Sequence, residues 1–204
     1  MKVAIIDYGM GNLRSVANAF NRYINSVEII NYPQKLKDAD KIVLPGVGAF
    51  RDGMKNLISG NWLDNLEEEV MHKEKPFLGI CLGMHLLATS GTEYGQHDGL
   101  NWISGIVEQI KCDSQEVRVP HIGWSDVQIT IKGGIYAGLE INQCFYFLHS
   151  YILKPERSDV VSATCKHGIE FAASVEINNI YATQFHPEKS QKAGLAVIDN
   201  FLKI

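Results

Sequence analysis

Residues 76–84 read Pro-Phe-Leu-Gly-Ile-Cys-Leu-Gly-Met, an apolar run that passes through a cysteine flanked by two glycines. The run before Cys81 is typical of a buried strand, and residues 82–89 have the apolar spacing of a helix. A cysteine at such a strand-to-helix turn is the pattern of a nucleophile elbow. Gly79 and Gly83 fit this pattern, because side chains two residues from the nucleophile would collide in so tight a turn. A buried structural cysteine can also end a strand, but the two glycines favour the nucleophile.

A thiolate nucleophile needs a base that can also return a proton to the leaving amine, and residues 184–189 supply a candidate. They read Gln-Phe-His-Pro-Glu-Lys and follow a strand-like run, so His186 is expected at a strand end. Glu188 can orient the imidazole and stabilise its charged form. Taken alone, His186 would be read as a packed histidine before a proline. Together with the elbow, it is predicted to form a triad with Cys81 and Glu188.

A carbonyl attacked by the sulfur becomes an oxyanion that backbone donors must hold. The N–H of Leu82 is the first candidate, because it follows the nucleophile at a helix start. Residues 45–48 read Pro-Gly-Val-Gly after another predicted strand, and they offer a second donor at Val47. The glycines let this backbone approach a ligand closely, although alone the segment would be read as a plain loop.

Outward from the elbow, predicted strands and helices alternate along the first half of the chain. Apolar runs predict strands at 2–7, 27–30, 41–44 and 76–80. Helical spacing predicts helices at 12–23, at 51–72 with a break near Gly60, and at 82–89. This alternation predicts a parallel sheet with helices on both of its faces.

The pattern changes after about residue 100. Short strands are predicted at 105–111, 125–131, 144–152, 160–166, 171–177 and 180–185, and a helix is predicted at 190–202. The sequence therefore predicts an α/β fold in which a mixed or antiparallel part is added to the parallel half. It contains no repeat or linker, so residues 1–204 are predicted to form a single domain.

Composition argues against several classes of protein. The net charge is −4 with no basic stripe, which gives no electrostatic case for nucleic-acid binding. No apolar stretch has the length of a membrane span, and the apolar run at the N-terminus is too short for a signal peptide. The four cysteines, Cys81, Cys112, Cys144 and Cys165, are widely spaced, and free thiols in a reducing cytoplasm are expected.

Neither a metal site nor a bound cofactor is predicted. The seven histidines form no His-x-x-x-His or Cys/His cluster, and His121 and His149 are expected to be packed, hydrogen-bonded side chains. Residues 9–14 begin like a dinucleotide-binding turn, but Arg14 stands where the third glycine belongs.

Taken together, these segments resemble the triad-type, class I glutamine amidotransferase family. Gly79–Gly83 and His186–Glu188 carry the resemblance to the whole family. Further matching segments resemble the glutaminase subunits that serve imidazole glycerol phosphate synthesis: residues 7–13, 45–50, 119–124, 145–151 and 184–190. The resemblance spans almost the entire chain and implies a flavodoxin-like, doubly wound, mostly parallel sheet of the class I glutamine amidotransferase type.

The resemblance also implies a reaction and roles for its residues. Cys81 would attack the side-chain amide of L-glutamine and form a glutamyl thioester, which water hydrolyses to glutamate. Val47, after a peptide flip, and Leu82 would form the oxyanion hole. Residues near the substrate would be Gly48, Ser150 and Tyr151. A TIM-barrel cyclase would receive the ammonia for histidine biosynthesis as the partner in a heterodimer. The residues facing it would be Asn12, Trp124, Tyr146 and Lys189.

His85 departs from the family pattern, which usually has glutamine four residues after the nucleophile, in contact with the substrate. Four residues along a helix lie on the same face, so His85 is expected to face the pocket and bind glutamine as a neutral imidazole. An unperturbed imidazole titrates near pH 6.5, so glutamine affinity would weaken as the pH falls through that value. The substitution leaves two alternatives open: a paralogue that supplies ammonia for amidation of a surface sugar, and a non-catalytic binding subunit. A stand-alone cysteine hydrolase is a third alternative, independent of His85.

Overall fold

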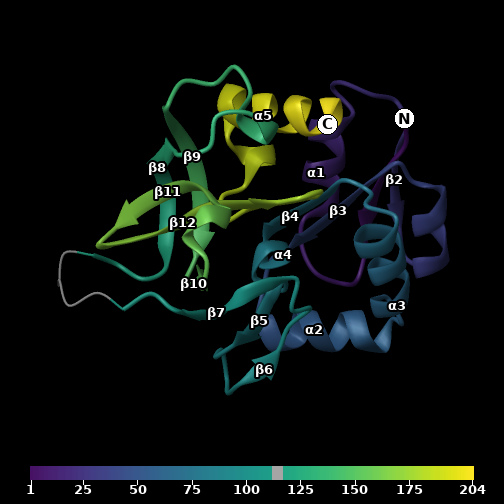
Figure 1. The fold of residues 1–204 in the computed structure, drawn as a ribbon, viewed down its shortest axis with the longest axis horizontal. Helices are drawn as coiled ribbons and strands as arrows, with labels where there is room; N and C mark the ends of the chain where they lie inside the picture. Colours follow the sequence, from purple (N-terminus) through teal and green to yellow (C-terminus); the bar gives the residue numbers. More distant parts are fainter. Residues whose placement is uncertain (112–116) are drawn as a thin grey trace.

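The computed structural model describes residues 1–111 and 117–204, and a nine-stranded sheet forms the centre of this part of the chain (Figure 1). Five of its strands run parallel in the order β2-β1-β3-β4-β13. They are β1 (Val3–Ile6), β2 (Val27–Ile30), β3 (Lys41–Gly46), β4 (Phe77–Cys81) and β13 (Ile180–Thr183). Counted alone, these strands have the order 2-1-3-4-5, which is the flavodoxin-like arrangement. The predicted α/β fold with a parallel core is confirmed.

Antiparallel strands extend the sheet beyond β13, as the sequence predicted. They are β12 (Ile169–Ile177), β11 (Val161–His167), β8 (His121–Ile129) and β9 (Asn142–His149). The single strand predicted over 144–152 is wrong, because the chain leaves the large sheet after His149 and begins β10 (Tyr151–Pro155) in a second sheet. Ser150 therefore marks the crossing between the two sheets.

The second sheet has four strands in the described residues, in the order β10-β7-β5-β6. The strands not yet introduced are β7 (Ile103–Gln109), β5 (Ala88–Gly91) and β6 (His97–Asp98). The β5–β7 pair is parallel and the other two pairs are antiparallel, so this sheet is the mixed part that the sequence predicted. The sequence analysis did not identify β5 or β6 as strands.

The helix predicted over 82–89 is too long. The helix α4 (Leu82–His85) ends after one turn, and the chain enters β5 at Ala88. The backbone carbonyls of Leu86 and Leu87 accept hydrogen bonds from Leu100 and Ile103, at 2.8 and 3.0 Å. Hydrogen bonds to residues 100–103 therefore replace those of the next helical turn.

Helices cover both faces of the parallel strands (Figure 1). The longer ones are α1 (Leu13–Phe20), α2 (Phe50–Ser59) and α5 (Gln191–Lys203), while α3 (Leu63–Leu66) continues into a π-helical turn at Glu67–His72. Shorter 3-10 turns occur at Pro33–Asp38, Gly134–Tyr136, Ser158–Val160 and Pro187–Lys189. Alternate residues of β1 divide between the faces: Val3 and Ile5 pack with α1 and α5, and Ala4 and Ile6 pack with α2.

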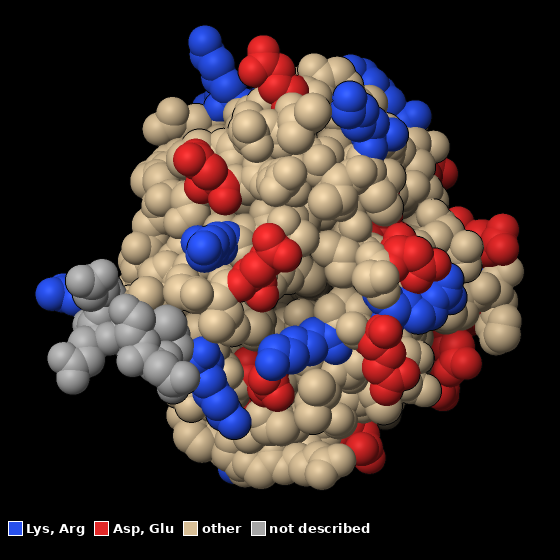
Figure 2. All heavy atoms as spheres, turned by 60° about the vertical axis from the view of Figure 1, so that its left-hand side comes forward, with Lys and Arg blue, Asp and Glu red and all other residues tan. Residues whose placement is uncertain are grey.

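The surface carries charges of both signs. On the face shown in Figure 2, acidic and basic side chains are interspersed. Among the described helices, none is long and apolar enough to cross a membrane. Within residues 1–111 and 117–204, no group of histidine, cysteine or acidic side chains is arranged to hold a metal ion. Cys81, Cys144 and Cys165 are free thiols, and Cys112 lies outside the described residues.

Backbone packing restricts the turn between β4 and α4. A Cβ built on Gly83 would overlap the carbonyl oxygen of Leu44 in β3, and one built on Gly79 would lie 2.8 Å from the carbonyl oxygen of Gly83. Neither obstacle is a flexible side chain, so the turn can form at this place only with glycine at both positions.

Replacing Gly83 by alanine should therefore lower the free energy of unfolding by about 3 kcal/mol, because the backbone of β3 or α4 must shift to make room. Urea denaturation measures this change. Gly53→Ala in α2 is the matched control, since its Cβ would meet only the mobile ends of Leu82 and Leu86, at 3.1–3.2 Å. If both proteins were equally stable, the packing of the turn would not be restrictive.

Candidate active site

Cys81 places its sulfur at the carboxyl end of the parallel sheet. It is the last residue of β4, its φ is +53°, and α4 begins at the next residue. A side chain rarely adopts this left-handed backbone, and such strain persists only where the surroundings impose it. Gly46, the last residue of β3, pairs with Cys81, so the segment that follows β3 runs beside the sulfur.

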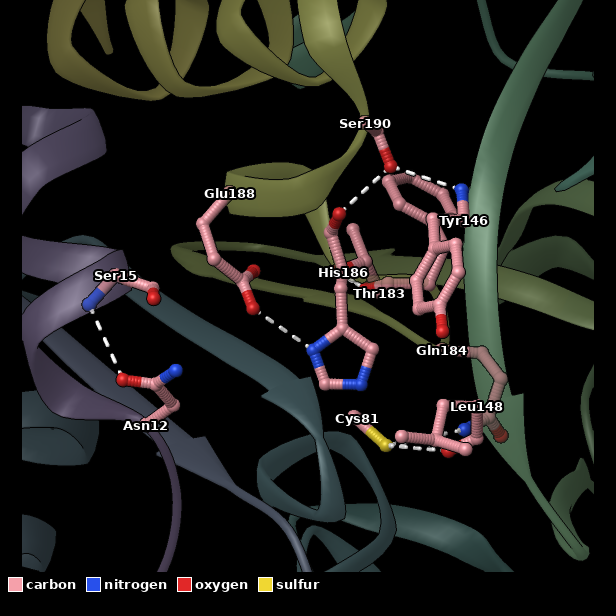
Figure 3. Close-up of polar contacts among 11 residues, drawn as sticks. Asn12, Ser15, Cys81, Tyr146, Leu148, Thr183, Gln184, His186, Glu188 and Ser190 are labelled. Atoms are coloured by element: carbon pink, nitrogen blue, oxygen red, sulfur yellow. Dashed lines mark hydrogen bonds and ion pairs between the residues drawn. The ribbon is translucent and has the colours of Figure 1, made fainter. Parts of the chain in front are cut away.

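His186 reaches the same place from the end of β13. Its Nδ1 lies 2.9 Å from Glu188 Oε1, and both side chains are 2% exposed. In Figure 3 the imidazole lies between Glu188 and Cys81. Its Nε2 is buried and has no hydrogen-bond partner within residues 1–111 and 117–204. Because Nδ1 donates to the carboxylate, Nε2 is the nitrogen that can exchange a proton with the sulfur or a substrate.

Backbone contacts fix this histidine in position. Its N–H donates to the carbonyl of Tyr146 at 2.9 Å, and its carbonyl accepts a hydrogen bond from Ser190 Oγ at 2.6 Å. The same hydroxyl oxygen accepts the N–H of Tyr146 at 2.9 Å (Figure 3). The 3-10 turn at Pro187–Lys189 then brings Glu188 back towards the ring.

The surroundings stabilise the charged form of His186. Burial by itself lowers the pKa of this histidine, but the nearby Cys81 sulfur and the Glu188 carboxylate, which accepts the Nδ1 proton, favour the charged ring and raise the pKa to about 10. The imidazole therefore accepts a proton readily and holds it for delivery to a leaving amine. Because the folded-state pKa is raised, the stabilisation from this proton is complete below about pH 6.5 and is lost as the pH rises towards about 10.

A cavity of about 140 Å³ opens beside the sulfur. Its lining comprises Val47, Gly48, Cys81, Leu82, His85, Glu93, Leu148, His149, Ser150 and Tyr151. The structure thus brings together both residues expected at the oxyanion hole and all four expected near the substrate. Sequence reasoning missed Glu93, whose Oε2 accepts the N–H of Phe50 at 2.8 Å. No local pattern marks this glutamate, which lies in the loop after β5.

The pKa of His85 is lowered to about 4 by burial, although hydrogen bonding to Gln184 and to the Tyr151 backbone opposes the shift. Its Nε2 is 2.7 Å from Gln184 Oε1. His85 is therefore neutral at physiological pH, as the sequence analysis supposed. The ring gains its second proton near pH 4 and not near the pH of 6.5 at which an unperturbed imidazole titrates. Protonation of His85 should therefore not change glutamine affinity near pH 6.5.

His121 and His149 are packed, hydrogen-bonded side chains, as predicted. The Tyr151 carbonyl is 2.9 Å from His149 Nδ1, His149 Nε2 is 3.0 Å from His121 Nδ1, and His121 Nε2 is 2.8 Å from Ser125 Oγ. Since a carbonyl can only accept, both histidine rings in this row of hydrogen bonds donate from Nδ1 and accept at Nε2. Burial lowers the pKa of both histidines, that of His121 to about 4 and that of His149 to about 2.

Three of the four residues expected to face a partner lie together next to His186, and the fourth, Asn12, lies on the other side of Glu188. Trp124 is 46% exposed and its ring centroid is 6.0 Å from that of Tyr146, while Lys189 Nζ lies 5.7 Å from the Tyr146 centroid. Tyr146 in turn lies 6.5 Å from the ring of His186. Asn12 is exposed at the start of α1, where its side chain caps Ser15, across from Glu188 (Figure 3).

Comparison with known proteins places this geometry in a family. The model of the class I glutamine amidotransferases matches residues 4–204. Imidazole glycerol phosphate synthase subunit HisH from Syntrophotalea carbinolica is 46% identical over 98% of both chains. HisH from Geobacter sulfurreducens is 46% identical over 98% of this chain and 97% of its own, and HisH 1 from Campylobacter jejuni is 42% identical over 99% and 100%.

Solved structures share the fold at much lower identity. A crystal structure of a glutamine amidotransferase aligns with a TM-score of 0.77 at 18% identity, covering 100% of this chain and 98% of its own. The PurLQS structure from Thermotoga maritima aligns with a TM-score of 0.74 at 16% identity, covering 99% of this chain and 97% of its own.

The family model and the HisH relatives together show the family. The chain belongs to the class I glutamine amidotransferases, and within them to the HisH subunits.

Proposed function

We propose that this chain hydrolyses L-glutamine to glutamate and ammonia, with Cys81 as nucleophile, His186 as acid and base, and Glu188 as the residue that orients His186. One observation carries the proposal: Glu188 holds Nδ1 of His186 at 2.9 Å, which leaves the buried Nε2 on the side of the sulfur (Figure 3).

The residues suit a two-step acyl transfer. The Cys81 thiolate attacks the amide carbon of glutamine, and the Nε2 proton of His186 passes to the nitrogen as the C–N bond breaks. Ammonia leaves and a thioester remains. Water then attacks the thioester while His186 takes its proton, and glutamate departs with regeneration of the thiolate. Glu188 keeps the ring oriented and stabilises it whenever it carries the extra proton.

Two backbone amides would hold the oxyanion. Leu82 N–H follows the nucleophile at the start of α4, and Val47 N–H belongs to the segment that runs beside Cys81. Val47 is 40% exposed and is followed by Gly48 with φ +130°, so this segment can change its peptide orientation without side-chain strain. We infer that a bound partner sets the productive orientation of the Val47 peptide.

The side-chain amide of the glutamine substrate must reach the sulfur. The cavity lining then offers partners for the ammonium and carboxylate groups at the other end of the molecule. The Glu93 carboxylate suits the ammonium group of the substrate. Gly48, Ser150 and Tyr151 supply backbone and hydroxyl groups at the crossing between the two sheets. His85 closes the inner end of the cavity as a neutral ring.

Ammonia release calls for an acceptor enzyme at the mouth of the site. The exposed Trp124 packs against the half-buried Tyr146, with Lys189 over the Tyr146 ring, and this group suits a protein partner. We assign this face to a TIM-barrel cyclase that receives the ammonia for imidazole glycerol phosphate synthesis in histidine biosynthesis, consistent with the names of the HisH relatives. We also propose a cytoplasmic location, where free thiols such as Cys144 persist.

The other candidate functions differ in what they require of this face. A stand-alone cysteine hydrolase needs no partner, and the exposed Trp124 argues against it. A glutaminase for amidation of a surface sugar would use the same triad with a different acceptor. The HisH relatives, which are subunits of imidazole glycerol phosphate synthase, favour the synthase.

Cys81→Ala should abolish glutamine hydrolysis, with a loss of at least about a thousandfold in kcat, because the thioester can no longer form. Glutamate release in the presence of the cyclase measures it. Cys144→Ala, at an exposed free thiol, is the matched control and should keep full activity. Hydrolysis that survives in Cys81→Ala would refute the assignment of the nucleophile.

Glu188→Gln should move the titration midpoint of the His186 imidazole to lower pH, because a neutral amide stabilises the imidazolium less than a carboxylate does. Nuclear magnetic resonance of ¹⁵N-labelled imidazoles follows this midpoint directly. Turnover should fall by about a hundredfold or more. The exposed Glu67→Gln serves as the control, and an unchanged His186 midpoint in Glu188→Gln would contradict the orienting role.

Trp124→Ala should weaken binding of the cyclase by about 2 kcal/mol, or roughly thirtyfold in Kd, because an exposed aromatic anchor is lost from the interface. Titration calorimetry with the purified cyclase measures the change. Tyr32→Ala is closely matched, since Tyr32 is also 46% exposed but follows β2, at the opposite edge of the large sheet from β8 and β9. Equal Kd values for the two variants would place the partner elsewhere.

A further inference from the structure

Gln184 is a buried polar residue that the mechanism above does not use. It stands two residues before His186 and is 0% exposed. Its backbone N–H donates to the carbonyl of Ala173 at 2.8 Å, which fixes where the side chain starts. Its amide nitrogen Nε2 lies 3.8 Å from Cys81 Sγ, and its oxygen Oε1 lies 2.7 Å from His85 Nε2 (Figure 3 shows Gln184 beside Cys81).

The orientation of this amide follows from its two neighbours. A neutral imidazole has one N–H, and a donor at His85 Nε2 requires an oxygen opposite it. The amide oxygen then faces His85, and the NH₂ group necessarily faces the sulfur. The opposite orientation would turn the amide oxygen towards the sulfur, where the Leu148 carbonyl oxygen already lies 3.8 Å away. We therefore assign the proton of the neutral His85 ring to Nε2, 2.7 Å from the Gln184 oxygen.

The sulfur needs a donor on this side. The carbonyl oxygen of Leu148 lies 3.8 Å from Sγ, within reach of a thiol proton. Once Cys81 is a thiolate, the same oxygen presents negative partial charge to a negative sulfur, which is unfavourable in a buried site. An N–H from Gln184 at a similar distance offsets that repulsion, because hydrogen bonds to charged groups are stronger than those to neutral ones.

We propose that Gln184 is a catalytic residue that donates a hydrogen bond to the Cys81 thiolate, and that His85 is the positioning residue that fixes the orientation of the Gln184 amide. The inference rests on the proposed nucleophilic role of Cys81. The test measures ionisation of the Cys81 thiol and not turnover. The inference about Gln184 can therefore fail while the role of Cys81 in glutamine hydrolysis remains valid.

The experiment follows alkylation of Cys81 by iodoacetamide as a function of pH, with the Cys81 peptide quantified by mass spectrometry. Gln184→Met keeps the length of the side chain but removes the donor. The midpoint of the rate profile should rise by about half to one pH unit, equivalent to the loss of one hydrogen bond. The other titratable groups around Cys81, which are Tyr8, Glu93, His149 and His186, are the same in every variant compared.

Variants of His85 separate positioning from packing. His85→Leu removes the donor and should raise the midpoint as Gln184→Met does. His85→Gln places an amide N–H at about the reach of the imidazole Nε2–H and should restore the parent midpoint. The double variant His85→Leu/Gln184→Met should shift no further than Gln184→Met alone, since both act through one contact. His72→Leu, at an exposed histidine, is the control.

A measurement on the parent protein complements the variants and does not depend on their folding. The side-chain ¹⁵N resonance of Gln184 should titrate with the same midpoint as Cys81 alkylation. The proposal is overturned if that resonance does not titrate, if Gln184→Met leaves the midpoint unchanged, or if it lowers the midpoint, which would mean that the oxygen faces the sulfur. A midpoint for His85→Gln equal to that of His85→Leu would overturn the positioning role.

Discussion

The close approach of α4 to β3 is the constraint on which the rest of the site depends. Gly83 lies so near the Leu44 carbonyl that no side chain fits, and the chain must turn sharply at Cys81, whose φ is +53°. The turn sets the sulfur at the carboxyl end of β4, between the ends of its hydrogen-bonded neighbours β3 and β13. Ligands of parallel α/β sheets bind outside these strand ends. The oxyanion segment, the nucleophile and the catalytic histidine therefore come together without any long loop.

Electrostatics then divides the buried histidines of the site into two kinds. His186 faces the carboxylate of Glu188 and the sulfur, which raise its pKa despite burial. The hydrogen-bond partners of His85 and His149 are amide, carbonyl or imidazole groups, and burial lowers the pKa of both. At neutral pH the site thus holds one charged imidazole beside two neutral ones. Such a separation lets His186 exchange protons while the walls of the cavity keep their hydrogen-bond pattern.

Much of this arrangement could be predicted from the sequence, and the failures share one cause. The Gly-x-Cys-x-Gly turn and the His-Pro-Glu segment are local signals, and each lies where it was expected. The end of α4 was misplaced because Leu86, Leu87 and Ala88 are all fully buried. The spacing of apolar residues there cannot distinguish a helix from a strand. The contact between His85 and Gln184 joins residues 99 positions apart, and no spacing in the sequence reports it. Features set by tertiary pairing are those that a single sequence hides.

The substitution at position 85 need not signal a changed function. Where the family usually has glutamine, the imidazole Nε2–H of His85 reaches about as far from the backbone as a glutamine amide N–H would. It therefore preserves one hydrogen-bond donor at the same depth, and the Gln184 oxygen at 2.7 Å accepts it. An ionised histidine there would bury a positive charge, but burial lowers the pKa to about 4 and prevents this at physiological pH. A neutral histidine is thus chemically compatible with the glutaminase site, and identities of 42–46% to HisH subunits over nearly the full chain fit a conserved reaction better than a diverged one.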